Sequence, residues 1–145
     1  MMRVVAAVDR TVDCPLGTDV LRNNAETTIS IPAAVEADFV RVDVHTGAAV
    51  TDQDVFQDCA HKTLRFREQL GVDSKVLADV DVKHAGPLGV ERSVGNRLAN
   101  LVERGLAGRM IVSGTATGEA VDTDTLEAAV AALRRPRTVD ADLCQ

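Results

Sequence analysis

The sequence predicts an α/β protein of the (β/α)8 TIM-barrel type, represented here by a partial barrel of about four parallel strands with flanking helices. Helical and strand patterns alternate with a repeat of roughly 30 to 35 residues, the length of a βα unit. Two strands carry valines on one face and charged side chains on the other. Helices cover both faces of a doubly wound sheet but only the outer face of a barrel, so this asymmetry favours the barrel.

The predicted elements follow one another without a linker, and residues 1–145 form a single domain. Helices and strands are called from the 3.6-residue and 2-residue periods of apolar side chains. In order, we expect a helix over 2–11, a strand over 15–21, a helix over 25–36, a strand over 39–44, a loop over 45–53, a helix over 55–70, a strand over 75–83, a helix over 92–104, a strand over 110–113, a loop over 114–121 and a helix over 124–134.

Punctuating residues support several of these boundaries. Pro32 and neighbouring β-branched residues lower the helix propensity of residues 25–36. Gly105 is expected to follow the helix over 92–104 as its C′ residue. Asp122 or Thr123 is expected to cap the last helix, which Pro136 stops, leaving residues 136–145 as an irregular tail.

The strand over residues 75–83 has the most informative pattern. Ala78, Val80 and Val82 lie on one face, and Asp79, Asp81 and Lys83 lie on the other, because side chains alternate along a strand. Burying three ionisable groups in a row is costly unless they line a polar interior. The strand over residues 39–44 repeats the pattern, with Arg41, Asp43 and His45 sharing a face. Such polar rows at strand ends are typical of a barrel active site.

Composition limits the classes of function. The net charge of −6 and the low aromatic content of 2% argue against nucleic-acid binding. The sequence has no run of about 18 apolar residues, so no transmembrane helix is predicted and a cytoplasmic location is the default expectation. Abundant Asp and scarce Lys suit a halophilic, salt-rich cytoplasm, and drift in a GC-rich genome is the alternative. The three cysteines, Cys14, Cys59 and Cys144, lack metal-binding spacing and are expected to be reduced.

A complete barrel needs about 250 residues, so the four predicted strands amount to half of one. Half a barrel leaves two open strand edges and an uncovered inner face. The chain is therefore expected to be a fragment, to associate with a second copy, or to be completed in another way. Self-association through the open edges is the partner interaction that this pattern predicts.

Four stretches resemble the BtpA/SgcQ family of predicted barrel proteins, and together the resemblance covers about residues 16–133. The stretches lie at residues 20–25, 39–53, 78–88 and 111–118, with the sequences VLRNNA, FVRV…TG…VTDQ, ADVDVKHAGPL and IVSGTATG. The resemblance implies a barrel that has two further strands at each end, so this chain corresponds to its middle half. Asp54, Gly95 and Asn100 depart from the family pattern. A truncated gene product is the simplest interpretation.

The family resemblance also bears on function. It implies a link to photosystem I biogenesis at the thylakoid, while other relatives stand in sugar-metabolism settings or are described as phosphoribosylanthranilate-isomerase-like. No established reaction follows from it.

Lys83, with Asp81 and Asp79, is the leading catalytic candidate. A lysine beside carboxylates can donate a proton, hold an enolate or phosphate, or form an imine. The Asp-x-Lys spacing places Asp81 and Lys83 about 6.5–7 Å apart on one strand face. A structural ion pair is the alternative. His84 follows directly and is interpreted either as an acid/base or metal ligand at the strand end, or as a structural histidine.

The remaining candidates are assigned to substrate binding. Arg41, Asp43 and His45 could bind a divalent metal with neighbouring carboxylates, or Arg41 and Asp43 could form an internal ion pair. Glycines after a strand allow close approach of an anion, so the loop after residue 113 is a candidate phosphate or sugar contact. The turn over residues 22–24 follows the first strand at the same position and is a second candidate. The substrate-binding set comprises Arg22, Asn23, Arg41, Asp43, His45, Thr46, Gly47, Asp52, Ser113, Gly114, Thr117 and Gly118.

These residues predict an enzyme of the isomerase, aldolase or lyase type that acts on a small, phosphorylated, sugar-like molecule, with Lys83 and Asp81 in proton transfer or charge stabilisation. The alternative is a non-catalytic assembly factor for a membrane complex, with peripheral membrane contact. A third interpretation is an inactive fragment that lacks half of its site. The resident cofactor, including any divalent metal, is left open.

Overall fold

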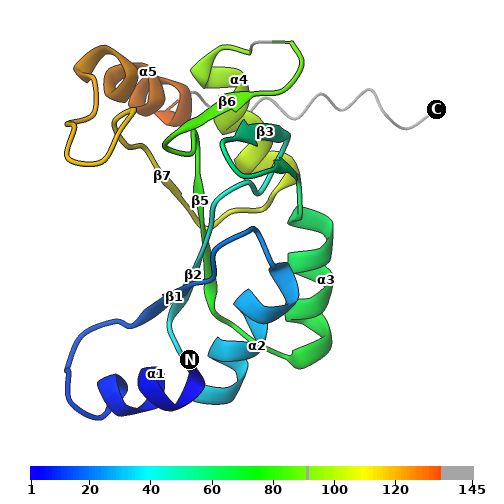
Figure 1. Cartoon of the computed structure of the whole chain (residues 1–145), viewed down its shortest axis with the longest axis vertical. Helices are drawn as coiled ribbons and strands as arrows, with labels where there is room; N and C mark the ends of the chain where they lie inside the picture. The colour runs from blue at the N-terminus through cyan, green and yellow to red at the C-terminus, as the bar shows by residue number, and fades with distance from the viewer. Residues whose placement is uncertain (91, 135–145) are drawn as a thin grey trace.

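The computed structural model describes residues 1–90 and 92–134. The predicted alternation of helices and parallel strands is confirmed, with a second small sheet inserted after two of the strands (Figure 1). The elements are α1 (Met2–Asp9), β1 (Gly17–Asp19), α2 (Ala25–Val35), β2 (Phe39–Val42), β3 (Ala48–Thr51), β4 (Val55–Gln57), α3 (Ala60–Leu70), β5 (Lys75–Asp79), β6 (Ala85–Pro87), α4 (Val94–Ala99), π-helix η1 (Asn100–Arg104), β7 (Arg109–Ile111) and α5 (Thr123–Arg134).

The main sheet has four parallel strands in the order β1-β2-β5-β7. Each strand pairs with the next parallel strand along the chain, so the order never reverses as it does in a doubly wound sheet. The register places Asp19 beside Arg41 and Arg41 beside Leu77. This sequential order is compatible with part of a barrel.

The hydrophobic core lies on one face of this sheet. Val40 and Val42 of β2 pack with Val76 of β5, Ile29 of α2 and Phe66 of α3. A second cluster continues the core beneath α4, η1 and α5, and comprises Ala78, Val80, Leu98, Leu101, Ala107 and Ala129. The valine face of each central strand is therefore the helix-covered face, as its sequence pattern predicts.

The opposite face of the sheet is less covered and more polar. Phe39, Arg41 and Leu77 are only partly buried there. The ring of Phe39 lies over β1, where a Cβ on Gly17 would come within 2.0 Å of it. A glycine at position 17 thus lets an aromatic ring pack flat on a strand of the polar face.

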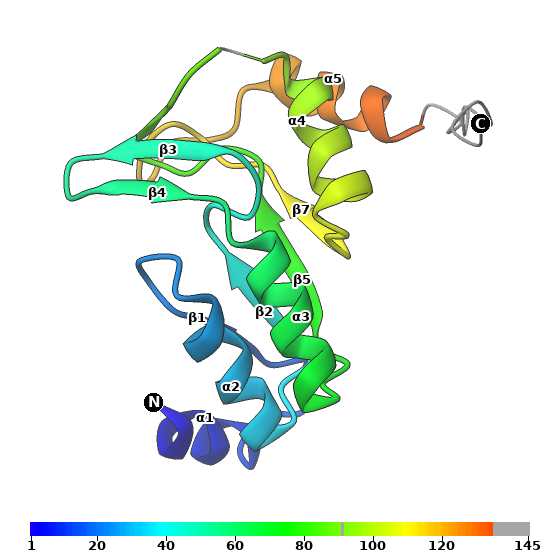
Figure 2. The ribbon, with the colours of Figure 1, turned by 90° about the vertical axis from the view of Figure 1, so that its right-hand side faces the viewer.

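A three-stranded antiparallel sheet in the order β4-β3-β6 lies beyond the carboxyl ends of β2 and β5. Figure 2 shows its β3–β4 hairpin extending across the upper end of the parallel strands. The expected loop over 45–53 therefore contains a strand, and the expected helix over 55–70 begins only at Ala60. Pairing with β3 makes Val55–Gln57 a strand, which the short pattern of these residues does not distinguish from the start of a helix.

Several predicted boundaries need correction. β5 ends at Asp79, so the strand expected over 75–83 is four residues too long. The helix expected over 92–104 is α4 followed by a π-helix, and Gly105 is its C-cap with φ of −79°, not a left-handed C′ residue. The predicted cap of the last helix is confirmed, because Asp122 Oδ2 accepts the backbone N–H of Thr125 at 2.9 Å. Pro136, Cys144 and the expected tail lie outside the described residues.

None of the described helices is long and apolar enough to cross a bilayer. Within the same residues, Cys14 is exposed and Cys59 is buried, and the two are not bonded to each other.

Candidate functional site

A cavity of about 200 Å³ lies at the carboxyl ends of β2 and β5. Its floor is formed by residues that directly follow or end the two strands, including Asp43, Asp79 and Asp81. Strands β3 and β6 of the small sheet cover it, and Arg97 and Asn100 line the side nearest the helices. The position agrees with the general rule that α/β sheets bind ligands at the carboxyl ends of their strands.

Two carboxylates form ion pairs with one guanidinium at this floor. Asp79 accepts two hydrogen bonds from Arg41, from Nε at 3.0 Å and from Nη2 at 2.6 Å. Arg41 Nη1 lies 3.8 Å from Asp19 Oδ2. The Asp79 side chain is 0% exposed, whereas the side chains of Arg41 and Asp19 are about one-third exposed. The internal ion pair expected between Arg41 and Asp43 is therefore formed by Arg41 with Asp79 and Asp19 instead.

Strand pleating explains why these groups meet. Arg41 and Asp79 both point away from the helix-covered face, and parallel pairing of β2 with β5 places Asp79 two residues beyond Leu77, the register partner of Arg41. Asp19 stands directly beside Arg41 on β1. The positive charge of Arg41 is therefore shared by two carboxylates. Asp43 lies close enough to interact electrostatically with Arg41, Asp79 and Asp19.

The surroundings of Asp43 and Asp19 raise the pKa of both carboxyls. Burial raises the pKa of Asp43, and repulsion from Asp19 and Asp79 adds to it against the attraction of Arg41. Burial also raises the pKa of Asp19, although Arg41 opposes the shift. Arg41 itself has a raised pKa because it donates hydrogen bonds to Asp79. A cavity carboxyl with a raised pKa is suited to donate and accept protons.

The leading sequence candidates, Asp81 and Lys83, lie beyond the end of β5, so they do not share a strand face with Asp79 as expected. Asp81 lines the cavity and accepts a hydrogen bond from Arg97 Nη2 at 2.8 Å. Lys83 is in the turn before β6 and is partly buried, and it is not among the residues that line this cavity. Of the predicted trio, the structure places Asp79 and Asp81 at the cavity.

His84 and Thr117, predicted separately, are brought together. The Nε2 atom of His84 lies 3.3 Å from Thr117 Oγ1, and the His84 backbone is left-handed with φ of 58°. This contact joins the turn after β5 to the loop after β7. His84 is exposed and does not line the cavity.

The glycine-rich loop after β7 is closed by its own polar groups. Thr115 Oγ1 donates to Glu119 Oε2 at 2.5 Å. A Cβ at Gly114 would come within 2.5 Å of the Glu119 carbonyl oxygen. Gly118 is left-handed with φ of 85°, and the hydroxyl of Ser113 is buried without a hydrogen-bond partner in the described part of the chain. Carbonyl oxygens, which are hydrogen-bond acceptors, therefore lie next to Gly114. The predicted phosphate contact would need hydrogen-bond donors at this position.

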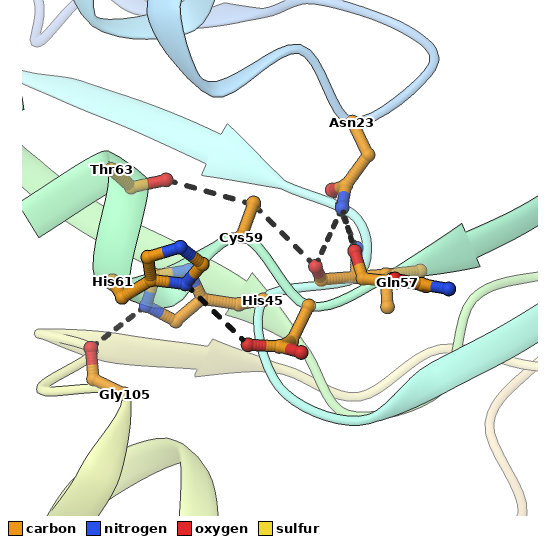
Figure 3. A network of polar contacts seen from close by, with 9 residues as sticks. Asn23, His45, Gln57, Cys59, His61, Thr63 and Gly105 are labelled. Atoms are coloured by element: carbon orange, nitrogen blue, oxygen red, sulfur yellow. Dashed lines mark hydrogen bonds and ion pairs between the residues drawn. The ribbon is translucent and has the colours of Figure 1, made fainter.

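Asn23 and His45 take part in a polar network behind the cavity (Figure 3). The Asn23 amide donates to the carbonyl oxygens of Val44 at 2.8 Å and Gln57 at 2.9 Å, and accepts the Val44 N–H at 3.0 Å. It therefore ties the turn after β1 to the segments around β2 and β4. Cys59 Sγ also lies 3.5 Å from the Val44 carbonyl oxygen, and burial raises the pKa of its thiol.

His45 is fully buried, and its Nε2 lies 2.7 Å from the carbonyl oxygen of Gly105 (Figure 3). A carbonyl only accepts, so Nε2 carries the proton and Nδ1 does not. Burial lowers the pKa of His45. β2 ends at Val42, so the alternation that grouped His45 with Arg41 and Asp43 does not reach it, and the ring points to η1 instead.

The other predicted binding residues separate into two groups. Thr46 and Gly47 line the cavity where β2 leads into the small sheet. Asp52 lies at the exposed tip of the β3–β4 hairpin, and Arg22 is exposed in the left-handed turn after β1, with φ of 67°. Within residues 1–90 and 92–134, no group of three or more His, Cys, Asp or Glu side chains is arranged to hold a metal ion.

Sequence reasoning missed two groups of residues at the cavity. Arg97 and Asn100 come from the α4–η1 segment, and a single arginine on a predicted helix gives no signal that it faces a cavity. The covering strands β3 and β6 were hidden because their antiparallel pairing is a contact between distant segments. Asp19 was visible as a charge in an apolar strand, and its register beside Arg41 is what the sequence could not supply.

Comparison with known proteins gives one family. The profile of the BtpA family matches residues 1–145. The chain is 41% identical over 134 residues to the photosystem I biogenesis protein BtpA of Synechocystis sp., covering 92% of this chain and 46% of that protein. It is 45% identical over 123 residues to the uncharacterized protein TK2179 of Thermococcus kodakarensis, covering 85% of this chain and 46% of that protein.

A third relative, the uncharacterized protein MJ1115 of Methanocaldococcus jannaschii, is 42% identical over 130 residues, covering 88% of this chain and 48% of that protein. The chain therefore spans about half the length of these curated relatives. No solved structure matches.

Proposed function

This chain belongs to the BtpA family, and from that premise we propose that it forms four strands of an α/β barrel whose active site includes the cavity above β2 and β5. The proposed activity is proton-transfer chemistry, of the isomerase or lyase type, on a small polar molecule such as a sugar derivative. The observation that carries the proposal is Asp43, a cavity-lining carboxyl whose pKa is raised.

Asp43 is the proposed general acid and base. A carboxyl works best in this role when its pKa lies close to the working pH, and burial together with two neighbouring carboxylates moves Asp43 in that direction. Arg41 and Asp79 are positioning residues in this scheme, because their bidentate pair holds the charges behind Asp43 in place. Asp81, held by Arg97, is the proposed contact for substrate hydroxyl groups at the same cavity.

The sequential strand order supports the barrel. In a barrel, the face that carries Arg41 and Leu77 points inward, and the helices α2, α3 and α4 form part of the outer ring. The relatives are about twice as long as this chain, which is the length that four further βα units would need. Lys83, in the turn before β6, remains a proposed participant in catalysis at the mouth of that barrel.

The proposal is tested by solvent deuterium exchange. The chain is incubated in D₂O with a panel of aldoses, ketoses and their phosphates, and loss of substrate C–H signals is followed by proton NMR. We expect exchange at a carbon next to a carbonyl group with the native chain and its loss in Asp43→Asn. Asp13→Asn, at an exposed position before β1, is the matched control and should retain exchange.

Circular dichroism of each variant separates loss of chemistry from loss of folding. Exchange that persists in Asp43→Asn would contradict the assigned role of this carboxyl. Absence of exchange for the entire panel with a folded chain would contradict the proton-transfer proposal itself.

A second candidate function is a non-catalytic role in building a membrane complex. It is favoured by the name of the cyanobacterial relative, a photosystem I biogenesis protein. Exposed apolar side chains would then form the contact surface, and Leu21 and Val90 are the clearest examples, with 75% and 87% of their surface exposed. This role predicts that Leu21→Ser abolishes association with membranes, whereas Asp43→Asn leaves it intact.

A further inference from the structure

A second cavity, of about 510 Å³, lies beside the first and has a different chemical character. Three arginines line it from separate parts of the chain: Arg65 from α3, Arg92 from the segment before α4, and Arg104 from η1. We call it the arginine cavity. It shares Thr46, Gly47, Arg92 and Asn100 with the first cavity, so the two cavities are adjacent and have one wall in common.

The charge of the arginine cavity is opposite to that of the chain. The whole chain has a formal net charge of −6, yet three arginine residues line this cavity. Asp58 is the one acidic residue among its described lining residues, and its carboxylate lies 3.8 Å from the imidazole of His61. Within the described part of the chain, no carboxylate lies within ion-pair distance of Arg65, Arg92 or Arg104.

Local structure explains why Arg104 lines this cavity. A π-helix is a rare element that is often found at functional sites, and η1 brings both Asn100 and Arg104 to the arginine cavity. Its end is held by the hydrogen bond between His45 and Gly105. The buried histidine therefore fixes the segment that presents Arg104.

The first turn of α3 adds to the positive potential. Ala60 and His61 of that turn line the arginine cavity, and no side chain caps the helix start at Cys59. The start of an eleven-residue helix carries a partial positive charge from its aligned peptide dipoles. This field adds to the positive potential of the three arginines. A bound anion would relieve the repulsion between these like charges.

We propose that the arginine cavity binds a phosphate monoester group. Guanidinium groups bind phosphate oxygens through paired, charge-assisted hydrogen bonds, and several arginines around one site are typical of phosphate recognition. The volume of 510 Å³ leaves room for a phosphate together with part of the molecule that carries it.

The shared wall gives this ligand an orientation. A molecule whose phosphate lies among the arginines would extend past Arg92 and Asn100 toward Asp43 in the first cavity. This orientation rests on the proposed function, whereas phosphate binding by the arginine cavity does not. The site also differs from the glycine-rich loop after β7, where the sequence pattern points to a phosphate contact.

The experiment is a phosphate titration of the full chain by isothermal calorimetry and by thermal unfolding, at constant ionic strength set with chloride. We expect saturable binding of inorganic phosphate and of a sugar phosphate, with a matching rise in the unfolding temperature. Arg104→Gln and Arg65→Gln should each weaken binding by about tenfold, as expected when a charged hydrogen-bond pair is lost. Arg3→Gln, an exposed arginine on α1, is the charge-matched control.

Asp43→Asn separates this inference from the proposed function, because it should abolish deuterium exchange while phosphate still binds. Native affinity for phosphate in folded Arg104→Gln and Arg65→Gln would overturn the inference, as would an absence of saturable binding at millimolar phosphate. A parallel arm measures sedimentation with phosphatidylglycerol vesicles. Binding to vesicles that requires Arg65 and Arg104, without binding of free phosphate or sugar phosphate, would assign the cavity to a lipid headgroup and overturn the monoester assignment.

Discussion

Arg41 and Asp79 join neighbouring strands across the polar face of the sheet, with Nε and Nη2 of the arginine 3.0 and 2.6 Å from the two carboxylate oxygens. The side chain of Asp79 is fully buried, and that of Arg41 is about one-third exposed. A buried carboxylate without a partner is costly, so the arginine makes the charge at Asp79 tolerable within the fold. Burial raises the pKa of the nearby Asp43, repulsion from Asp19 and Asp79 adds to the shift, and Arg41 opposes it.

Removing Arg41 should destabilise the chain. Arg41→Met leaves Asp79 buried without its counter-ion, and we expect the free energy of unfolding to fall by about 2–3 kcal/mol, less than for a fully buried pair because Arg41 is partly solvated. Urea unfolding followed by circular dichroism measures the change. The double variant Arg41→Met/Asp79→Leu should recover most of the loss. If the double variant is as unstable as Arg41→Met, the unpaired carboxylate is not the cause.

Asp43 should lower stability at neutral pH. Its pKa in the folded chain is raised above the ordinary value of 3.8, so folding favours the protonated form. That stabilising contribution is fully present below pH 3.8 and is lost as the pH rises through the folded-state pKa. Asp43→Asn should therefore be more stable than the native chain at pH 7, with the difference shrinking toward pH 4. Unfolding free energies at several pH values test this, and a native chain that is more stable at pH 7 would contradict it.

His45 should make the fold sensitive to mild acid. Burial lowers its pKa below the ordinary value of 6.5, so folding favours the neutral ring. Its contribution is present above pH 6.5 and is lost as the pH falls through the folded-state pKa. We expect the loss of unfolding free energy between pH 7 and pH 5 to be smaller in His45→Gln than in the native chain. His61→Gln, at an exposed position, is the control and should keep the native pH dependence.

Gly105 should not tolerate a side chain. A Cβ there would lie 2.7 Å from the Leu101 carbonyl oxygen and 2.9 Å from Cδ2 of His45. Gly105→Ala must shift the end of η1 or the histidine, and we expect a cost of about 1–3 kcal/mol in unfolding free energy. Gly108→Ala is the matched control, since its nearest contact would be an ordinary 3.5 Å. Equal stability of the two variants would contradict the close packing of Gly105 against His45.

The helix and strand alternation could be predicted because it follows from local periodicity. Valines at every second position of β2 mark the face that α2 and α3 cover, and the charged positions mark the other face. The helix cap at Asp122 is a signal within four residues. The antiparallel sheet could not be predicted, because β3 reaches β6 across more than thirty residues and neither strand has a distinctive pattern.

The candidate site was predicted in part for the same reason. Arg41 and Asp79 are polar positions on strands that alternation places on one face, and Asp43 directly follows β2 and lines the cavity. Asp81 and Lys83 continue that alternation in the sequence, but β5 has already ended at Asp79, and strand length depends on which neighbours remain to be paired. The arginine cavity left no sequence signal, because its arginines lie on three separate segments.

The sequence by itself determined the family, the order of the elements and the face of each parallel strand that meets the core, since these depend on motifs and on short-range periods. Tertiary structure decided the partners of each charge. Strand register set Asp79 and Asp19, not Asp43, against Arg41, and the packing of η1 turned His45 away from the polar face toward Gly105. Contacts between distant segments select such partners by their geometry and by the desolvation of the charges. The pattern of residues along the sequence gives information on neither.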